Sequence, residues 1–411
     1  MLNFKFNQNE INKIGQFSKK EKDFRLKNLL YFNEVGFPNK RSEEWKFSDL
    51  NDIISKNFKN LKIKFDLPKK QNVEFIKDFE HNYIIIVNGE LSESNFKFEN
   101  KSKIKIQSYS DVYSKDEEKK NPLIFLNNAL SNKGYCLKVD DNYKFEKILV
   151  IYNLFTDDLN ENILNSRNLI QLGKNSEVHT LTIDINKSKK NFFNNVFETL
   201  TLNEASTFKN IYLQNNKSNG YFHKYLKSKL LSDTNYSSYI LTKGLKFNKI
   251  DLEFDLKGER SECNLKAASF INKNEHQEIK TRINHYAPNC KSFQKVKNCV
   301  EGSSKGVYQG KIFVKDVAQK TDAYQLSKAI LLAEDAEFDA KPELEIYADD
   351  VKCSHGSTSG SIDENAVYYL MSRGLNKEES IKLLVDGFLN EIVEDIKNNS
   401  IKNYIEKKLN Y

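Results

Sequence analysis

The sequence lacks the long apolar segments and paired cysteines that mark membrane and secreted proteins. Its longest apolar runs, residues 83–87 and 148–152, are far shorter than the roughly 20 residues that a helix needs to cross a bilayer. No apolar leader with a small-residue cleavage site follows Met1. The five cysteines are odd in number and form no CxxC pair, which is typical of a reducing compartment. These absences predict a cytoplasmic protein with no membrane association.

Histidines and the common catalytic motifs are also scarce. Only six histidines are present, so few imidazoles are available for metal binding or acid–base chemistry. The chain has no GxGxxG after a strand and no GxxxxGK[ST], HExxH or GxSxG. Its net charge of +7 is spread over short, interrupted runs and does not form the basic face of a nucleic-acid binder. We expect neither nucleotide hydrolysis by this chain nor a nucleic-acid partner.

The chain nevertheless has the length and the aromatic residues to fold. Its 411 residues suit two or three domains, and 28 Phe with 20 Tyr exceed what a disordered chain carries. Apolar positions among the charges of residues 9–35 predict amphipathic helices, which Gly36-Phe37-Pro38 then ends. From residue 83 to about 351, the pattern changes to short β-branched and aromatic runs, which are typical of strands.

Polar turn clusters separate these strands at a nearly constant interval. They begin at Asn175, Glu204, Asp233, Arg260 and Asn289, so successive steps are 29, 29, 27 and 29 residues. A near-constant step of this size indicates a repeating array, and a parallel β-helix fits better than a propeller because the signatures of propeller blades are missing. The alternative is an antiparallel sandwich whose turns happen to fall regularly. A solenoid also leaves open strand edges that something must cover.

The C-terminal part returns to helix. Asp363 is placed to cap a helix that ends before Gly374, and Asn376 with Glu379 resembles a capping box. A broad apolar stripe with three- and four-residue spacing then runs over residues 381–396. Such a stripe packs on its own domain or docks a partner, and periodicity does not decide between the two.

Residues 342–358 contain the most informative local pattern. If 351–355 is extended, Cys353 and His355 share one face about 7 Å apart, and a thiolate with an imidazole suits zinc or iron. Two ligands do not close a four-coordinate site, so others would come from elsewhere in the fold, from sulfide or from another chain. The simpler interpretation makes Cys353 a small buried hydrophobe and His355 a hydrogen-bonded turn residue.

The remaining cysteines and histidines show no ligand spacing. Glu275-His276 with Glu278 comes nearest, and we interpret it as a polar face. Cys290 and Cys299 are nine residues apart, too far for a one-turn ligand pair. They belong to the core or lie near Cys353 across neighbouring coils, and the sequence leaves both options open.

Residues 349–358, followed by 368–374, closely resemble the C-terminal signature of the SufD branch of the SufB/SufD family, from the sulfur-mobilisation (Suf) system of iron–sulfur cluster assembly. Ser357 and Ser359 depart from it, since the family more often has Ala and Val there. SufB-like chains are longer, with an acidic Glu-His-Glu-type sequence at this point and an additional N-terminal cysteine motif, none of which is found here. Weaker similarities to the family occur at residues 41–47, 87–89, 126–129, 310–312, 318–323 and 331–332.

The resemblance implies a right-handed parallel β-helix (residues 81–360) between an N-terminal helical region (1–80) and a C-terminal helical domain (361–411). It implies a non-catalytic scaffold that pairs with SufB through its β-helix and with the ATPase SufC through its C-terminal helices. His355 would then help to hold a transient iron or iron–sulfur cluster shared with SufB, with Cys353 as a second candidate ligand. Docking of the ATPase is assigned to four residues of the C-terminal helices: Tyr368, Arg373, Leu384 and Phe388.

Three other functions stay open at this stage. The chain could be a SufB-like scaffold that associates with itself, and a homodimer in the absence of SufB is compatible with the sequence. It could be a β-helix carbohydrate-active enzyme, although such enzymes are normally exported and need clustered carboxylates or basic residues on one face. It could also be a stand-alone metal-binding or redox protein. Cluster type and flavin binding are not determined by the sequence.

Overall fold

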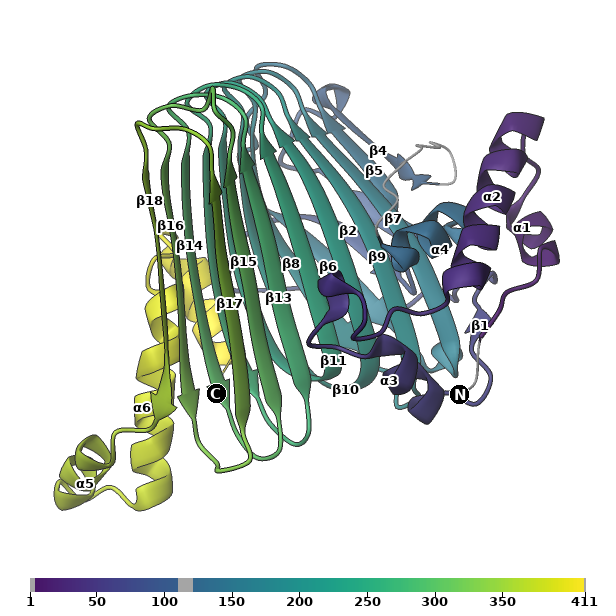
Figure 1. The fold of residues 1–411 in the computed structure, drawn as a ribbon. Coiled ribbons are helices and arrows are strands. Elements are labelled where there is room, and N and C mark those ends of the chain that lie inside the picture. The colour runs from purple at the N-terminus through teal and green to yellow at the C-terminus, as the bar shows by residue number, and fades with distance from the viewer. Residues whose placement is uncertain (1–3, 110–120, 410–411) are drawn as a thin grey trace.

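The computed structural model describes residues 4–109 and 121–409, apart from the side chains of residues 216–218. The chain forms a parallel β-solenoid of about eight turns, with N-terminal helices near one end and C-terminal helices near the other (Figure 1). Strands two apart in sequence pair in parallel from β5 to β10 and again from β11 to β18, so successive strands alternate between two faces. This confirms the parallel β-helix flanked by helices and excludes the antiparallel sandwich.

The two faces share two long strands. β10 (Thr207–Leu230) pairs with β8 through its first half and with β9 through its second, and β11 (Asn235–Leu256) likewise pairs with β12 and β13. The other strands of the first face are β2 (Asn82–Val87), β6 (Leu149–Phe155), β8 (Glu177–Asn186), β12 (Glu262–Ile271), β14 (Lys291–Val300), β16 (Asp322–Leu331) and β18 (Lys352–Ser361). Those of the second face are β5 (Tyr135–Val139), β7 (Asn162–Leu172), β9 (Phe192–Leu202), β13 (His276–His285), β15 (Lys305–Val314) and β17 (Glu337–Ile346).

A repeated corner explains the spacing seen in the sequence. One residue of each corner adopts a left-handed backbone conformation, with φ between 52° and 59°: Asn175, Ala205, Asp233, Arg260, Asn289 and Lys320. The next residue is Ser or Thr at five corners, and its hydroxyl donates to the carbonyl three residues before it: Ser176, Ser206, Thr234, Ser261 and Thr321. Cys290 occupies this position at the remaining corner, and its thiol lies 3.3 Å from the Gly258 carbonyl. The corner therefore needs one left-handed residue followed by a short hydrogen-bonding side chain.

Antiparallel strands and a buried helix start the solenoid. β3 (Glu90–Asn95) pairs antiparallel with β2, and β4 (Ile104–Ser108) pairs antiparallel with β5, with the 3₁₀ turn η2 (Lys101–Lys103) before β4. A further 3₁₀ turn, η4 (Asp157–Leu159), joins β6 to β7. Helix α4 (Pro122–Leu130) packs against β7 and β9, and all nine of its residues are buried. The sequence analysis did not predict this helix.

The N-terminal segment lies along the outside of the second face. It forms α1 (Asn9–Ile14), α2 (Lys19–Val35), the 3₁₀ turn η1 (Glu43–Trp45), α3 (Leu50–Asn57) and the short strand β1 (Lys62–Ile63), which pairs with β7. The helices expected within residues 9–35 are confirmed, and the second ends at Val35, directly before Gly36, which has a φ of 75°. Figure 1 shows α1 and α2 beside α4 at the N-terminal end.

The C-terminal helices cover part of the first face. α5 (Glu364–Ser372) begins at the Asp363 cap, and α6 (Lys377–Val393) begins with the predicted capping box of Asn376 and Glu379. α6 packs on β12 and β14, and α7 (Asn399–Leu409), which the sequence analysis did not predict, packs on β10. Among the helices of the described residues, none is long and apolar enough to cross a membrane.

Candidate functional site at the open end of the solenoid

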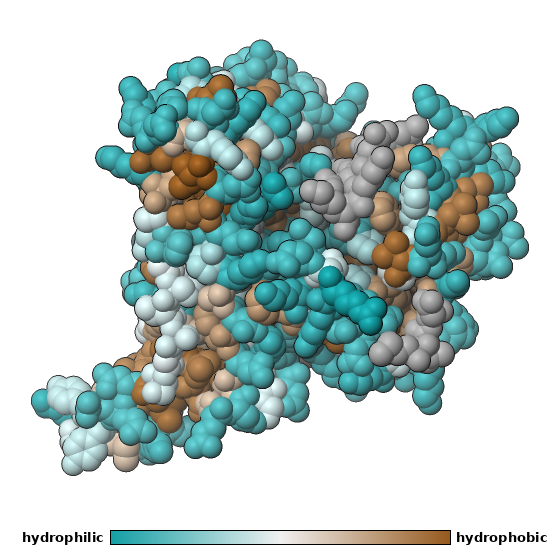
Figure 2. Space-filling view, in the orientation of Figure 1, coloured by the Kyte–Doolittle hydropathy of each residue, from teal (hydrophilic) through white to brown (hydrophobic). Residues whose placement is uncertain are grey.

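The two faces end at β17 and β18, whose outer edges have no strand partner among the described residues. The β18 edge is unusual because residues 353–361 contain no charged residue and no proline. Figure 2 shows a strip of pale side chains, neither strongly hydrophilic nor hydrophobic, at the left margin where Figure 1 places β18. Natural edge strands usually carry charges or prolines that prevent pairing with another chain, so the uncharged β18 edge is open to a partner strand.

His355 stands on this edge strand with its side chain on the inward side of the coil. Its neighbour in register on β16 is Gln325, which is buried in the interior, and alternation places Cys353 on the same side. The His355 side chain is nevertheless exposed because no further coil covers it. Within the described residues, its imidazole makes no hydrogen bond or ion pair. The interpretation of His355 as a turn residue is therefore wrong, because it lies in the middle of an extended strand.

Cys353 faces the same way but is half-buried. It packs with Ala323, Ile312 and Leu344 of the last coils. Burial raises the pKa of its thiol, which holds it in the protonated form at neutral pH. In this environment Cys353 has the properties of a small packed side chain, and it becomes a ligand only if a partner or a metal changes that environment.

The other cysteines do not gather near this pair. Cys290 lies at a corner of the solenoid, whereas Cys299 faces outward from β14 and packs in the cluster that includes α6. In the parts of the chain that the structure describes, no group of three or more His, Cys, Asp or Glu side chains could hold a metal ion.

The helices after β18 leave one exposed aromatic surface. Tyr368, Tyr369 and Met371 of α5 are 75%, 56% and 42% exposed, and the Arg373 guanidinium lies over the Tyr369 ring at 5.2 Å. α5 projects away from the solenoid at its lower end in Figure 1. We call Tyr368, Tyr369 and Met371 the α5 patch.

Most of the apolar stripe on α6 is occupied by the protein itself. Leu389 and Ile392 are fully buried against outward residues of the first face, and Val385 is 3% exposed. Phe388 packs at the margin of this cluster with the Lys297 ammonium 4.3 Å from its ring centre, and Leu384 is half-buried. Of the two roles left open for the stripe, packing on the protein's own domain is therefore confirmed for its central part, which holds α6 on the solenoid.

The sequence analysis missed a buried ionic cluster on the outside of the second face. The Lys249 ammonium lies 3.1 Å from Asp251 and also bonds Glu278, and both Lys249 and Glu278 are fully buried. Ser48 donates to Glu278 and lies 2.9 Å from His276 Nε2. Burial alone would raise the pKa of Glu278, but Lys249 and His276 lower it to about 2. The polar face expected at this segment is present, but the N-terminal segment covers it.

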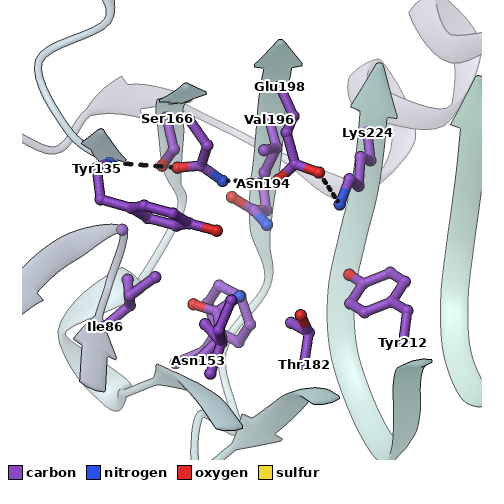
Figure 3. A pocket seen from close by; sticks show the side chains of 14 residues that line it. Ile86, Tyr135, Asn153, Ser166, Thr182, Asn194, Val196, Glu198, Tyr212 and Lys224 are labelled. Atoms are coloured by element: carbon purple, nitrogen blue, oxygen red, sulfur yellow. Dashed lines mark hydrogen bonds and ion pairs between the residues drawn. The ribbon is translucent and has the colours of Figure 1, made fainter. Parts of the chain in front are cut away.

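The interior of the N-terminal half contains a polar pocket. Figure 3 shows the Glu198 carboxylate and the Lys224 ammonium directed toward each other from neighbouring strands, at a distance of 2.9 Å. Tyr212 lies nearby, with the Lys224 ammonium 4.9 Å from its ring centre. The two charges compensate each other inside the solenoid, so we assign this pair a structural role.

Fold and site together define a parallel β-helix protein that presents a histidine on an open strand edge. Residues 154–388, more than half of the chain, match the family model described as SUF system FeS cluster assembly, SufBD core domain. The chain therefore belongs to the SufBD family of SUF-system iron–sulfur cluster assembly proteins, and it is SufD-like.

Individual relatives agree over most of the chain. The iron–sulfur cluster assembly protein SufD of Escherichia coli K12 is 25% identical over 379 residues, which cover 90% of this chain and 88% of that protein. An iron–sulfur cluster assembly SufBD family protein of Synechocystis is 26% identical over 386 residues, covering 87% and 84%. SufD of Bacillus subtilis is 32% identical over 133 residues, covering 31% and 30%. These similarities favour an assembly protein over a carbohydrate-active enzyme.

Proposed function

We propose that this chain is a non-catalytic scaffold subunit that pairs with SufB and with the ATPase SufC to acquire iron and build new clusters. The observation that carries the proposal is the uncharged β18 edge with His355 exposed on it. A strand added to this edge would bond to the free backbone groups, extend the first face and cover the end of the core. Pairing would then bring a SufB strand alongside His355.

In this assembly, His355 supplies one ligand of a site that two chains share. Neutral imidazole binds iron, while sulfide and a cysteine of SufB would complete the coordination. Iron and sulfide are substrates here, held transiently and passed on as a cluster. Cys353 has a protonated thiol in the unpaired chain, so we assign the metal first to His355 and treat Cys353 as packing. The absence of a three-ligand group among the described residues supports a shared site.

The α5 patch is the surface that we assign to the ATPase. Three exposed apolar or aromatic side chains on one projecting helix bury well against a partner groove, and Arg373 adds a cation beside them. α6 is anchored to β12 and β14 and continues from α5, so a pull on α5 is transmitted toward the last coils. Closure of SufC on ATP would in this way strain the SufB interface and open His355 to iron.

Co-expression tests the proposed assembly directly. A tag on this chain should recover SufB and SufC together at a fixed ratio, whereas recovery of a homodimer alone would contradict the heteromeric scaffold and favour the self-associating alternative. Iron retained in stoichiometric amount by the single purified chain would instead favour a stand-alone metal protein.

A further inference from the structure

The inward surface of the solenoid becomes polar in its last coils, directly beneath His355. Four residues stand in register on adjacent strands of the first face: Leu265, Gln294, Gln325 and His355. The column thus passes from an apolar side chain to two buried carboxamides and then to the exposed imidazole. Enclosing a carboxamide in a core costs free energy unless its N–H and C=O groups are hydrogen-bonded. Two carboxamides in succession therefore need an explanation.

Tyr308, on β15 of the second face, places its hydroxyl between the ends of both carboxamides, and its single proton can be donated to one of them. Its hydroxyl oxygen lies 3.2 Å from Gln294 Oε1 and 3.5 Å from Gln325 Oε1. Gly310 provides the space for this contact, because a Cβ at this position would lie 2.2 Å from Gln325 Oε1 and 2.5 Å from the Tyr308 hydroxyl oxygen. A side chain at position 310 would therefore displace the end of the Gln325 carboxamide or the Tyr308 ring, so the glycine leaves room for both.

Gln325 still has unused hydrogen-bonding capacity. Its side chain is 1% exposed, yet its Nε2 has no hydrogen-bond partner within the described residues, and its Oε1 has only the long contact to Tyr308. Adjacent strands lie about 4.8 Å apart, so Gln325 and His355 are neighbours on the inward side. The imidazole is the polar side chain that stands in register above the carboxamide, and it too lacks a partner within the described chain.

We propose that Gln325 is the positioning residue of His355. For this role the carboxamide is turned end for end, so that its Nε2 donates to the Tyr308 hydroxyl oxygen. Its Oε1 then accepts the N–H of one ring nitrogen of His355, which leaves the other nitrogen unprotonated and directed toward the open end, where iron is held. A histidine that binds a metal nearly always donates its second ring N–H to an oxygen acceptor, and this bond fixes the tautomer. The inference rests on the role of His355 proposed above, and it adds Tyr308 and Gly310 as the residues that fix the carboxamide.

The histidine tautomer gives a direct test in the full-length chain. Two-bond ¹H–¹⁵N spectra of protein labelled with [¹⁵N]histidine, recorded at about pH 8 where free imidazole is neutral, report which ring nitrogen carries the proton. The His355 signals are assigned by their loss in His355→Asn. We expect one tautomer in the unsubstituted chain and a mixture in Gln325→Leu. Gln325→Glu should restore one tautomer, because a carboxylate accepts the same N–H.

Ser327→Ala is the matched control. Ser327 lies two residues along β16 and donates to Ser357 of β18 at 2.8 Å, so its loss weakens the same pair of strands without touching the imidazole. The proposal is overturned if the unsubstituted chain already shows a mixture, or if Gln325→Leu keeps the same tautomer. The remaining histidines report whether each variant is folded, and Gln325→Met replaces Gln325→Leu if that variant does not fold. The spectrum tests the Gln325–His355 contact, whereas cluster assembly by His355→Ala tests the proposed role of His355. Failure of one claim can therefore be told apart from failure of the other.

Discussion

Trp45 packs against His223, with ring centres 5.5 Å apart and ring planes inclined at 34°. The indole is fully buried, and the Lys249 ammonium lies 4.9 Å from its ring centre. The N-terminal segment is thus fastened to the second face by an aromatic side chain that covers the buried ions Lys249 and Glu278. Trp45 and His223 lie far apart in the sequence, so this contact ties the N-terminal segment to the middle of the chain.

Replacing this indole should loosen the N-terminal segment. We expect Trp45→Ala to lower the free energy of unfolding by about 3–5 kcal/mol, because a large buried side chain is lost and water reaches the ion pair beneath it. Urea unfolding measures the change, and limited proteolysis should cut the variant first within the N-terminal segment. Leu67→Ala is the control, since Leu67 is 79% exposed. Equal stability of the two variants would show that Trp45 does not hold the segment.

The stability of the fold should fall in mild acid because of His285. This side chain is fully buried, Ser292 is its hydrogen-bonding neighbour at 2.9 Å, and burial lowers its pKa to about 4. The unfolded chain takes up a proton near pH 6.5 but the folded chain resists it, so stability is lost as pH falls from about 6.5 to about 4, by up to about 3 kcal/mol. His285→Gln should flatten this dependence in urea titrations, and an unchanged slope would contradict the assignment.

The β18 edge should be sensitive to proline. The Lys352 N–H donates to the Thr321 carbonyl, so the alternation of parallel strands places the N–H groups of Cys353, His355 and Ser359 at the free edge. We expect Ser359→Pro to reduce recovery of SufB by about fivefold or more, because a donor to the partner strand is lost while the bonds to β16 remain. Ser359→Ala is the matched control. Equal recovery with both variants would place the SufB interface elsewhere.

The α5 patch should be specific for the ATPase. Tyr368→Ser removes the most exposed aromatic ring of the patch, so we expect weaker recovery of SufC with unchanged recovery of SufB. Tyr31→Ser, at an exposed tyrosine of α2 near the other end of the chain, is the control. Loss of both partners from Tyr368→Ser, or of neither, would contradict the separation of the two surfaces.

The repeat and the terminal helices could be predicted because their signals are local. Each corner needs a left-handed residue followed by Ser, Thr or Cys, so residues such as Asp233 and Thr234 recur along the chain at the spacing of the coils. The caps at Asp363 and Asn376 act within one helical turn, and both are confirmed. The extended conformation and shared face of Cys353 and His355 also follow from local alternation.

The features that were missed depend on partners distant in the sequence or lack a regular spacing of apolar residues. Helix α4 is buried on every side, so its residues show no amphipathic repeat, although Asn121 before Pro122 is a recognisable start. α7 had a usable signal in Ile401, Tyr404 and Ile405 at helical spacing. Glu278 could not be recognised as buried, because the group that covers it, Ser48, lies 230 residues earlier in the chain.

The most direct test of the account replaces the imidazole at the open end. In a strain that depends on this pathway, His355→Ala should still recover SufB and SufC but should lose cluster assembly. Ser357→Ala, two residues along on the same inward side of β18, should assemble clusters normally. Normal cluster assembly by His355→Ala in an intact complex would contradict the claim that this chain completes a shared iron site.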